Sequence, residues 1–158
     1  MSLAIHRTAI VALLAAVPSI GVVHDEEPYA RTEGAWRSLY LWTAGDGSQQ
    51  LRGWFLRRVR TRETMTGVGR TVNAHTWQVR GFMALMPPDT GKTFDGLVEA
   101  FRQAVRNDPD FGGAIVPGPL DQPTGVQVTD SGPVMFCGVL CHSATLALTT
   151  YEYLDFGE

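Results

Sequence analysis

Apolar and polar positions recur along the chain with two different periods, and each period predicts its own kind of element. Between residues 94 and 105 the apolar spacing is helical, at i, i+3, i+4 and i+7. The apolar residues of this stripe are Phe94, Leu97, Val98, Phe101, Ala104 and Val105. Thr93 is the expected N-cap of this helix, and Asn107-Asp108-Pro109 is its expected end.

A second helical stripe lies near the N-terminus. Its members are Leu3, Ile10, Leu13, Leu14 and Val17. Residues 9–17 also have the apolar character of a secretory signal, but Pro18 stands where a small-residue cleavage site is expected. We therefore favour a short helix packed on the core and ended by Pro18. No run reaches the roughly 18 apolar residues of a bilayer span, so we expect a soluble protein.

Most other apolar positions alternate with a period of two, which is typical of half-buried strands. The clearest case is residues 71–85. One face there carries His75, Trp77, Val79, Gly81 and Met83, and the other carries Thr76, Gln78 and Arg80. This pattern, together with the extended residues 51–62, predicts a long projecting hairpin at about 51–85. The Gly- and Thr-rich segment 64–70 is its expected tip.

The remaining extended segments are shorter or follow turn signals. We expect strands at residues 20–24, 36–43, 126–129 and 134–153. Residues 130–133 are expected to be a turn, and the Gly- and Pro-rich stretch 112–125 a loop. No repeat or linker divides residues 1–158. The prediction is one α+β domain, with an antiparallel or mixed sheet, one long amphipathic helix on its face and the short N-terminal helix.

Candidate chemistry is sparse. The segment Thr90-Gly91-Lys92-Thr93 lacks the first glycine of a phosphate-binding loop, because a methionine occupies that position. The segment Gly67-Val68-Gly69 lies in the hairpin tip rather than in a strand-to-helix turn, which argues against a dinucleotide site. Cys137, Cys141 and His142 have no second ligand pair for zinc, so reduced thiols in the core are favoured. We expect no enzyme, no cofactor and no metal.

The charges are divided unevenly along the chain. The net charge is −3, yet residues 1–80 carry 10 basic and 6 acidic side chains, whereas residues 81–158 carry 3 and 10. Seven arginines fall on the predicted hairpin, namely Arg52, Arg57, Arg58, Arg60, Arg62, Arg70 and Arg80. They are candidates for contact with a neighbouring subunit or another partner. An ordinary solvated strand face is the alternative.

Acidic residues of the second half are candidates for the opposite side of such a contact. They are Asp108, Asp110, Asp121, Asp130, Glu152 and Asp155. Opposite charges on two different patches suit head-to-tail association of copies. The same arginines beside Trp54 and Phe55 could instead bind nucleic acid by phosphate contacts and stacking, although the mildly acidic composition argues against a dedicated nucleic-acid binder.

The order of these parts resembles a known family. The segments that carry the resemblance are Pro18–Val23 after the first helix, Thr76–Phe82 in the hairpin, Phe94–Val105 in the amphipathic helix, Asn107–Gly113 after it, and Cys141–Glu152 near the end. In pattern and order they resemble the tail terminator, or tail completion, proteins of long-tailed bacteriophages. The likeness spans nearly the whole chain but contains no catalytic signature.

The resemblance implies a structural role in the virion tail or neck, with assembly in the host cytoplasm. Such proteins form a ring, typically a hexamer, that stops polymerisation of the tail tube and offers a surface to the head connector or stopper. The implied partners are other copies of the chain, the tail tube protein and the connector, with DNA passing through the ring and no membrane. Another neck component, such as a head-closure or head–tail joining protein, stays open, as does a nucleic-acid-binding module.

Overall fold

A mixed sheet of six strands and three helices make up the fold, which confirms the predicted α+β class. The computed structural model describes residues 2–86, 90–116, 118 and 125–155. In chain order the elements are α1 (Ser2–Ala15), β1 (Val22–His24), α2 (Glu33–Leu39), β2 (Leu41–Thr43), β3 (Gln49–Gly67), β4 (Arg70–Ala84), α3 (Thr90–Asn107), β5 (Gln127–Phe136) and β6 (Val139–Asp155).

The sheet has the strand order β1-β3-β4-β6-β5, and β2 pairs with β3 beside this path. Only β1 runs parallel to its neighbour, and all the other pairs are antiparallel. β4 is paired along its whole length, by β3 on one side and β6 on the other. β3 and β5 therefore form the two long margins of the sheet.

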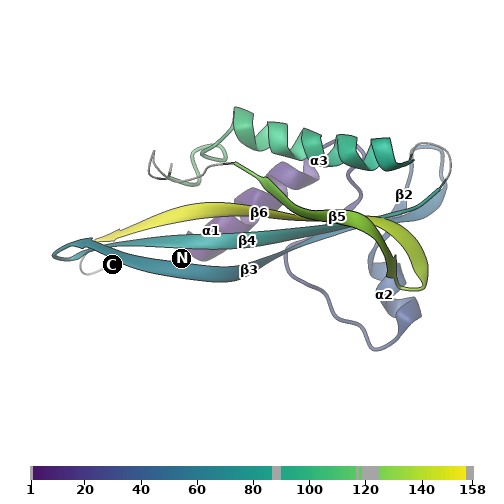
Figure 1. Cartoon of the computed structure of the whole chain (residues 1–158), viewed down its shortest axis with the longest axis horizontal. Helices are drawn as coiled ribbons and strands as arrows, with labels where there is room; N and C mark the ends of the chain where they lie inside the picture. Colours follow the sequence, from purple (N-terminus) through teal and green to yellow (C-terminus); the bar gives the residue numbers. More distant parts are fainter. Residues whose placement is uncertain (1, 87–89, 117, 119–124, 156–158) are drawn as a thin grey trace.

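The predicted long hairpin is β3 and β4, and its turn is much tighter than expected. Pairing continues to Gly67 opposite Arg70, so the turn is Val68-Gly69 rather than the whole segment 64–70. Gly69 has a φ of +74°, a left-handed conformation that glycine adopts without a steric penalty. β6 also runs to the end, where Asp155 pairs with Arg70. The projection beyond the helices is thus three strands wide (Figure 1).

α1 and α3 cover one face of the sheet, and the main hydrophobic core lies between these helices and the strands. The strand residues on this face are Trp54, Leu56, Trp77, Val79, Met83, Ala144, Leu146 and Leu148. The predicted stripe of α3 is confirmed, since Phe94, Leu97, Val98, Phe101 and Val105 are all buried. The Trp54 ring stacks on Phe94, with ring centroids 5.6 Å apart, over the backbone of Gly81.

Several predicted boundaries are wrong for local reasons. α3 begins at Thr90, which places Thr93 inside the helix rather than at its N-cap. Residues 36–39 belong to α2 and not to a strand, because Thr32 caps this helix by accepting a hydrogen bond from the Ala35 N–H at 3.1 Å. Aromatic residues near this segment suggested a strand, whereas the cap and the pair between Glu33 and Arg37 favour a helix.

The turn predicted at residues 130–133 is also wrong, because these residues lie within β5. Pro133 is tolerated there since β5 is an edge strand. The turn between β5 and β6 is instead Cys137-Gly138, with φ values of 53° and 73°, as a type I′ hairpin turn requires. The two cysteines therefore lie on a turn and on a strand. Cys141 is fully buried, and burial raises the pKa of its thiol to about 11.

A smaller core lies on the opposite face of the sheet. Its position is marked by α2, which lies at the end of the sheet far from the hairpin tip (Figure 1). Phe82 stacks on Phe136 with ring centroids 3.9 Å apart, and Tyr40 packs edge-on against both. α2 is fastened over this cluster by Arg37, whose Nε and Nη2 donate to the Cys137 carbonyl at 3.1 and 2.6 Å. Toward the tip, none of the described helices covers this face (Figure 1).

A buried polar network joins α1 to the centre of the sheet. Thr150 Oγ1 accepts a hydrogen bond from Trp77 Nε1 at 2.8 Å and lies 2.8 Å from His6 Nδ1. His75, predicted as a packed strand residue, is 3% exposed and lies between Thr61 Oγ1 and Glu152 Oε2 at 2.8 and 2.9 Å. Burial, helped by nearby His75, holds the pKa of His6 below its ordinary value.

Folding stability should therefore depend on the protonation of His6. Its pKa is lower in the folded than in the unfolded chain, so the unfolded chain binds more protons as the pH falls below about 6.5. The free energy of unfolding should decrease through this window and stop decreasing below the lowered folded pKa. Urea denaturation at pH 7.5 and 5.0 should show a smaller decrease for His6→Gln than for the wild type. Equal decreases would contradict this account.

Gly81 should be intolerant of a side chain because a Cβ there would overlap the Trp54 ring. We expect Gly81→Ala to lower the free energy of unfolding by about 1–3 kcal/mol, the usual cost of overpacking. Gly132→Ala is a matched control, since Gly132 lies on β5 with no atom within 4 Å of the added Cβ, and it should change stability by less than about 0.5 kcal/mol. Chemical denaturation of the two variants compares them directly.

Candidate functional site

The hairpin arginines are distributed between the two faces by the strand register. Arg57 pairs with Gln78 and Arg80 with Phe55, which puts both arginines on the face opposite α1 and α3. A β-bulge between Arg58 and Arg60 adds one residue and reverses the alternation. Arg60 and Arg62 consequently return to the face of Arg57. Without the bulge they would point to the helix side.

We define the arginine face as the helix-free surface formed by Arg57, Arg60, Arg62 and Arg80. Arg57 Nη1 lies 3.1 Å from Glu27 Oε2. Arg60 and Arg62 are exposed, and neither has an ion-pair partner within the described part of the chain. Arg80 is half-buried over the Phe82 ring, and its Nε has no hydrogen-bond partner among the described residues.

The other arginines of the predicted set serve different purposes. Arg52 has a structural role within the chain, because it is 7% exposed, donates from Nη1 to the Ser19 carbonyl at 2.9 Å and lies over the Trp42 ring. Burial lowers the pKa of its guanidinium. Arg58 is on the helix side and donates to Thr61 Oγ1 at 3.2 Å. Arg70, at the tip, pairs with Asp155 at 3.4 Å.

The predicted acidic counterpart is not a single surface. Glu152 contacts His75 at the helix-covered face, and Asp155 is already paired with Arg70 of the same chain. Asp108 accepts a hydrogen bond from the Gly112 N–H at 2.8 Å in the turn after α3, and Asp110 lies in the same turn. Asp121 lies outside the described residues. Asp130 alone among the described candidates is exposed on the β5 edge, opposite the β3 margin.

In the part of the chain that the structure describes, no strand pairs with the outer edge of β3 from Arg57 to Gly67 or with the outer edge of β5. β1 covers β3 only at Gly53–Phe55, and from Arg57 to Gly67 all 11 residues of β3 are exposed. β5 forms the other margin, and its first five residues are exposed. An unpaired strand presents a row of backbone N–H and C=O groups that another chain can join. The bulge and the extent of these margins were not predicted from the sequence.

Small and polar side chains line the arginine face beside the arginines. Ala74, Thr76 and Gln78 of β4 lie between the arginines and the β6 residues Ala147 and Thr149. The described residues contain no group of three or more His, Cys, Asp or Glu side chains placed to hold a metal ion. In the same part of the chain, no helix has both the length and the apolar character of a bilayer span.

Comparison with known proteins adds no family assignment. No protein-family model matches the chain, and no curated protein matches it significantly.

Surface and structural arginines should differ sharply in their effect on stability. The double variant Arg60→Glu/Arg62→Glu should keep the free energy of unfolding within about 0.5 kcal/mol of the wild type, because both side chains are exposed. Arg52→Ala should lower it by about 1–3 kcal/mol, because the Ser19 carbonyl loses its donor. Urea denaturation measures both. A large loss from the double variant would mean that the arginine face stabilises the fold itself.

Proposed function

We propose that the protein is a structural, non-enzymatic virion component that forms a ring at the end of a phage tail tube, where it stops tube polymerisation and offers a surface for joining to the head. The likeness of its sequence pattern to tail terminator proteins supports this, and so does its α+β fold. The observation that carries the proposal is the pair of unlike free margins on one sheet.

Strand directions make these margins suitable for a ring. β3, β4, β6 and β5 alternate in direction, so β3 of a second copy can continue the alternation beside β5 of the first. Both copies then point the same way. Because β3 meets β5 and never another β3, the contact is head-to-tail, and repeated contacts close into a ring when the rotation between copies allows it.

Charge supports the same contact. The β3 margin carries Arg57, Arg58, Arg60 and Arg62, whereas the β5 margin carries Asp130. Attraction between these margins favours the unlike pairing over pairing of two basic margins. The arginines on the helix-free face are then also available to the tail tube, because α1 and α3 cover the opposite face of the sheet.

Nucleic-acid binding by the hairpin is less well supported. Base stacking needs exposed aromatic rings, but Trp54 is 0% and Phe55 4% exposed. Phosphate contacts by the arginine face remain the basis of this alternative. A titration with double-stranded DNA at two salt concentrations tests it, because phosphate binding weakens steeply as salt increases.

Ring formation is tested by the mass of the purified protein in solution. The wild type should elute as an oligomer, a hexamer on the family resemblance, by size-exclusion chromatography with light scattering. Arg60→Glu/Arg62→Glu should shift the population to monomers, because it places like charges opposite Asp130. Arg106→Glu is the control, since Arg106 is an exposed residue of α3 that pairs with Glu99 and belongs to neither β3 nor β5. A monomeric wild type at high concentration would contradict the ring.

The position of the ring in the particle is tested by electron microscopy of particles made without the protein. Overlong tails are expected from loss of a terminator. Tails of normal length that fail to join heads would instead identify a head-closure or joining protein, and the proposal would then be wrong in its position on the tail.

A further inference from the structure

The two margins of the sheet lie at different levels along the strands. Asp130 of β5 is in the same cross-strand row as Arg80 of β4 and Phe55 of β3. β5 begins in the row of Arg57 and runs away from the hairpin tip, whereas the exposed edge of β3 runs from Arg57 toward the tip. At the level of β5, β1 already pairs with β3. Two copies can therefore join these margins only if one copy is shifted along the strands relative to the other.

The alternation of side chains restricts which β3 residue can lie opposite Asp130. The register places Asp130 on the helix-free face, and a continuous sheet keeps each row on one face. The exposed β3 residues on that face are Arg57, Arg60, Arg62 and Thr64. If Arg57 or Arg60 lay opposite Asp130, the end of β5 would run onto the part of β3 that β1 occupies. Thr64 is uncharged, so Arg62 is the position that combines free backbone with opposite charge.

The neighbouring positions are compatible with this register. Gly132 falls opposite Arg60, and no atom lies within 4 Å of a Cβ added at Gly132. The Arg60 guanidinium therefore has room beside the carboxylate of Asp130. Pro133, which has no backbone N–H, falls opposite Val59, the extra residue of the β3 bulge. The missing donor of β5 thus meets a point where the pairing pattern of β3 is already irregular.

The size of the shift is compatible with a closed ring. Arg62 lies in the row of Ala74, six residues along β4 from Arg80, which is a shift of about 20 Å at about 3.3 Å per residue. The four long strands β3, β4, β6 and β5 have a width of about 19 Å at about 4.8 Å per strand. A shift about equal to this width inclines the strands by about 45° to the ring axis, at the upper end of the tilts of about 35–45° in closed barrels.

We propose that β3 of one copy pairs with β5 of the next in one defined antiparallel register, in which Arg62 lies opposite Asp130 and the copies are shifted along their strands by about 20 Å. Neither side chain has an ion-pair partner among the described residues of its own chain, so each is available to the neighbour. This inference rests on the proposed ring and specifies its junction.

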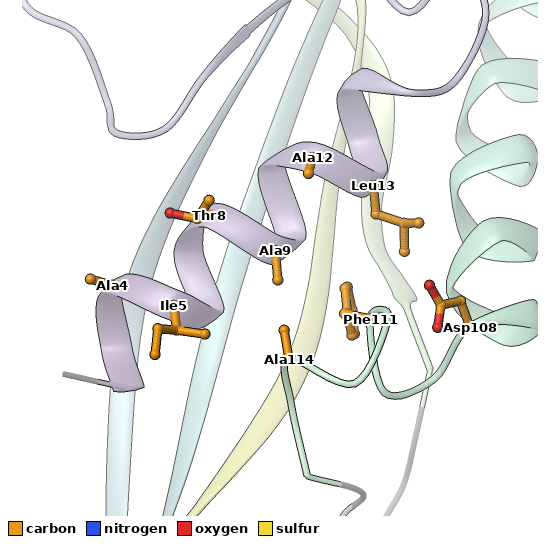
Figure 2. A pocket seen from close by; sticks show the side chains of 9 residues that line it. All are labelled: Ala4, Ile5, Thr8, Ala9, Ala12, Leu13, Asp108, Phe111 and Ala114. Carbon is orange, nitrogen blue, oxygen red and sulfur yellow. The ribbon is translucent and has the colours of Figure 1, made fainter.

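The junction does not include the helix side of either copy. An apolar groove of about 550 Å³ lies on that side, between α1 and the turn after α3 (Figure 2). Its lining residues, which include Ile5 and Phe111, belong to neither β3 nor β5. Substitutions in the two margins therefore test the junction without altering this groove.

Disulfide cross-linking tests the register. In a Cys137→Ser background, where Cys141 is fully buried, Asp130→Cys/Arg62→Cys should give a ladder of linked multimers on a non-reducing gel after mild oxidation. Asp130→Cys/Arg57→Cys is the matched control, because Arg57 is exposed on the same face but lies four β4 rows from Arg62, about 13 Å away. This distance is too long for a disulfide, so the control should give no ladder.

The outcomes separate the register from the ring itself. A ladder from the control pair, or no ladder from either pair while light scattering still shows an oligomer, overturns the register and leaves the ring standing. A wild type that is monomeric throughout overturns both.

Exchange of the two charges is an independent measurement. Arg62→Asp and Asp130→Arg should each raise the protein concentration at half-assembly by about tenfold or more, because like charges then face each other. The double variant Asp130→Arg/Arg62→Asp should return this concentration to within about threefold of the wild type. Asp130→Arg/Arg70→Asp has the same net charge and should not restore assembly, because Arg70 lies on β4. Circular dichroism confirms that the variants fold. No restoration by the exchange, or equal restoration by the control, overturns the register.

Discussion

The stacking of Trp54 on Phe94 is the contact on which the arrangement of the molecule depends. The indole is fully buried, lies over the glycine backbone at position 81 and donates from Nε1 to the Ile20 carbonyl at 2.8 Å. One side chain of β3 thus fixes β4, α3 and the segment after α1. Everything on β3 beyond Leu56 lies past this anchor, so the strand can project as an exposed margin without weakening the core.

Periodicity predicted the parts of the fold that burial controls. The apolar stripe of α3 and the alternation of β4 are both confirmed, because each is a direct consequence of which side chains leave water. Helix and turn boundaries depended on local backbone geometry, which the sequence pattern did not show. The cap at Thr32 makes a helix of a segment that looks extended, and the left-handed Cys137 places a turn where no Gly-Pro or Asn-Gly signal stands.

The candidate site was likewise only partly predictable. The clustering of arginines on the hairpin could be predicted from the sequence, but their distribution between its two faces could not. A single bulge between Arg58 and Arg60 decides which face the outer arginines occupy, and a bulge leaves no compositional signal. The burial of Arg52 against the Trp42 ring likewise requires the tertiary structure, since an arginine on a strand is ordinarily exposed.

Because helices cover mainly one face of the sheet, much of the other face and the strand edges are exposed. Two helices bury one face of the sheet, whereas α2 covers only one end of the other. The outer edge of β3 has 11 successive exposed residues and no described partner strand, and such a margin exposes a protein to unwanted pairing. Arginines along β3 repel a second β3 and admit a margin of opposite charge. The same residues discourage nonspecific sheet pairing, and in the proposed ring they direct the β3 margin toward one partner surface.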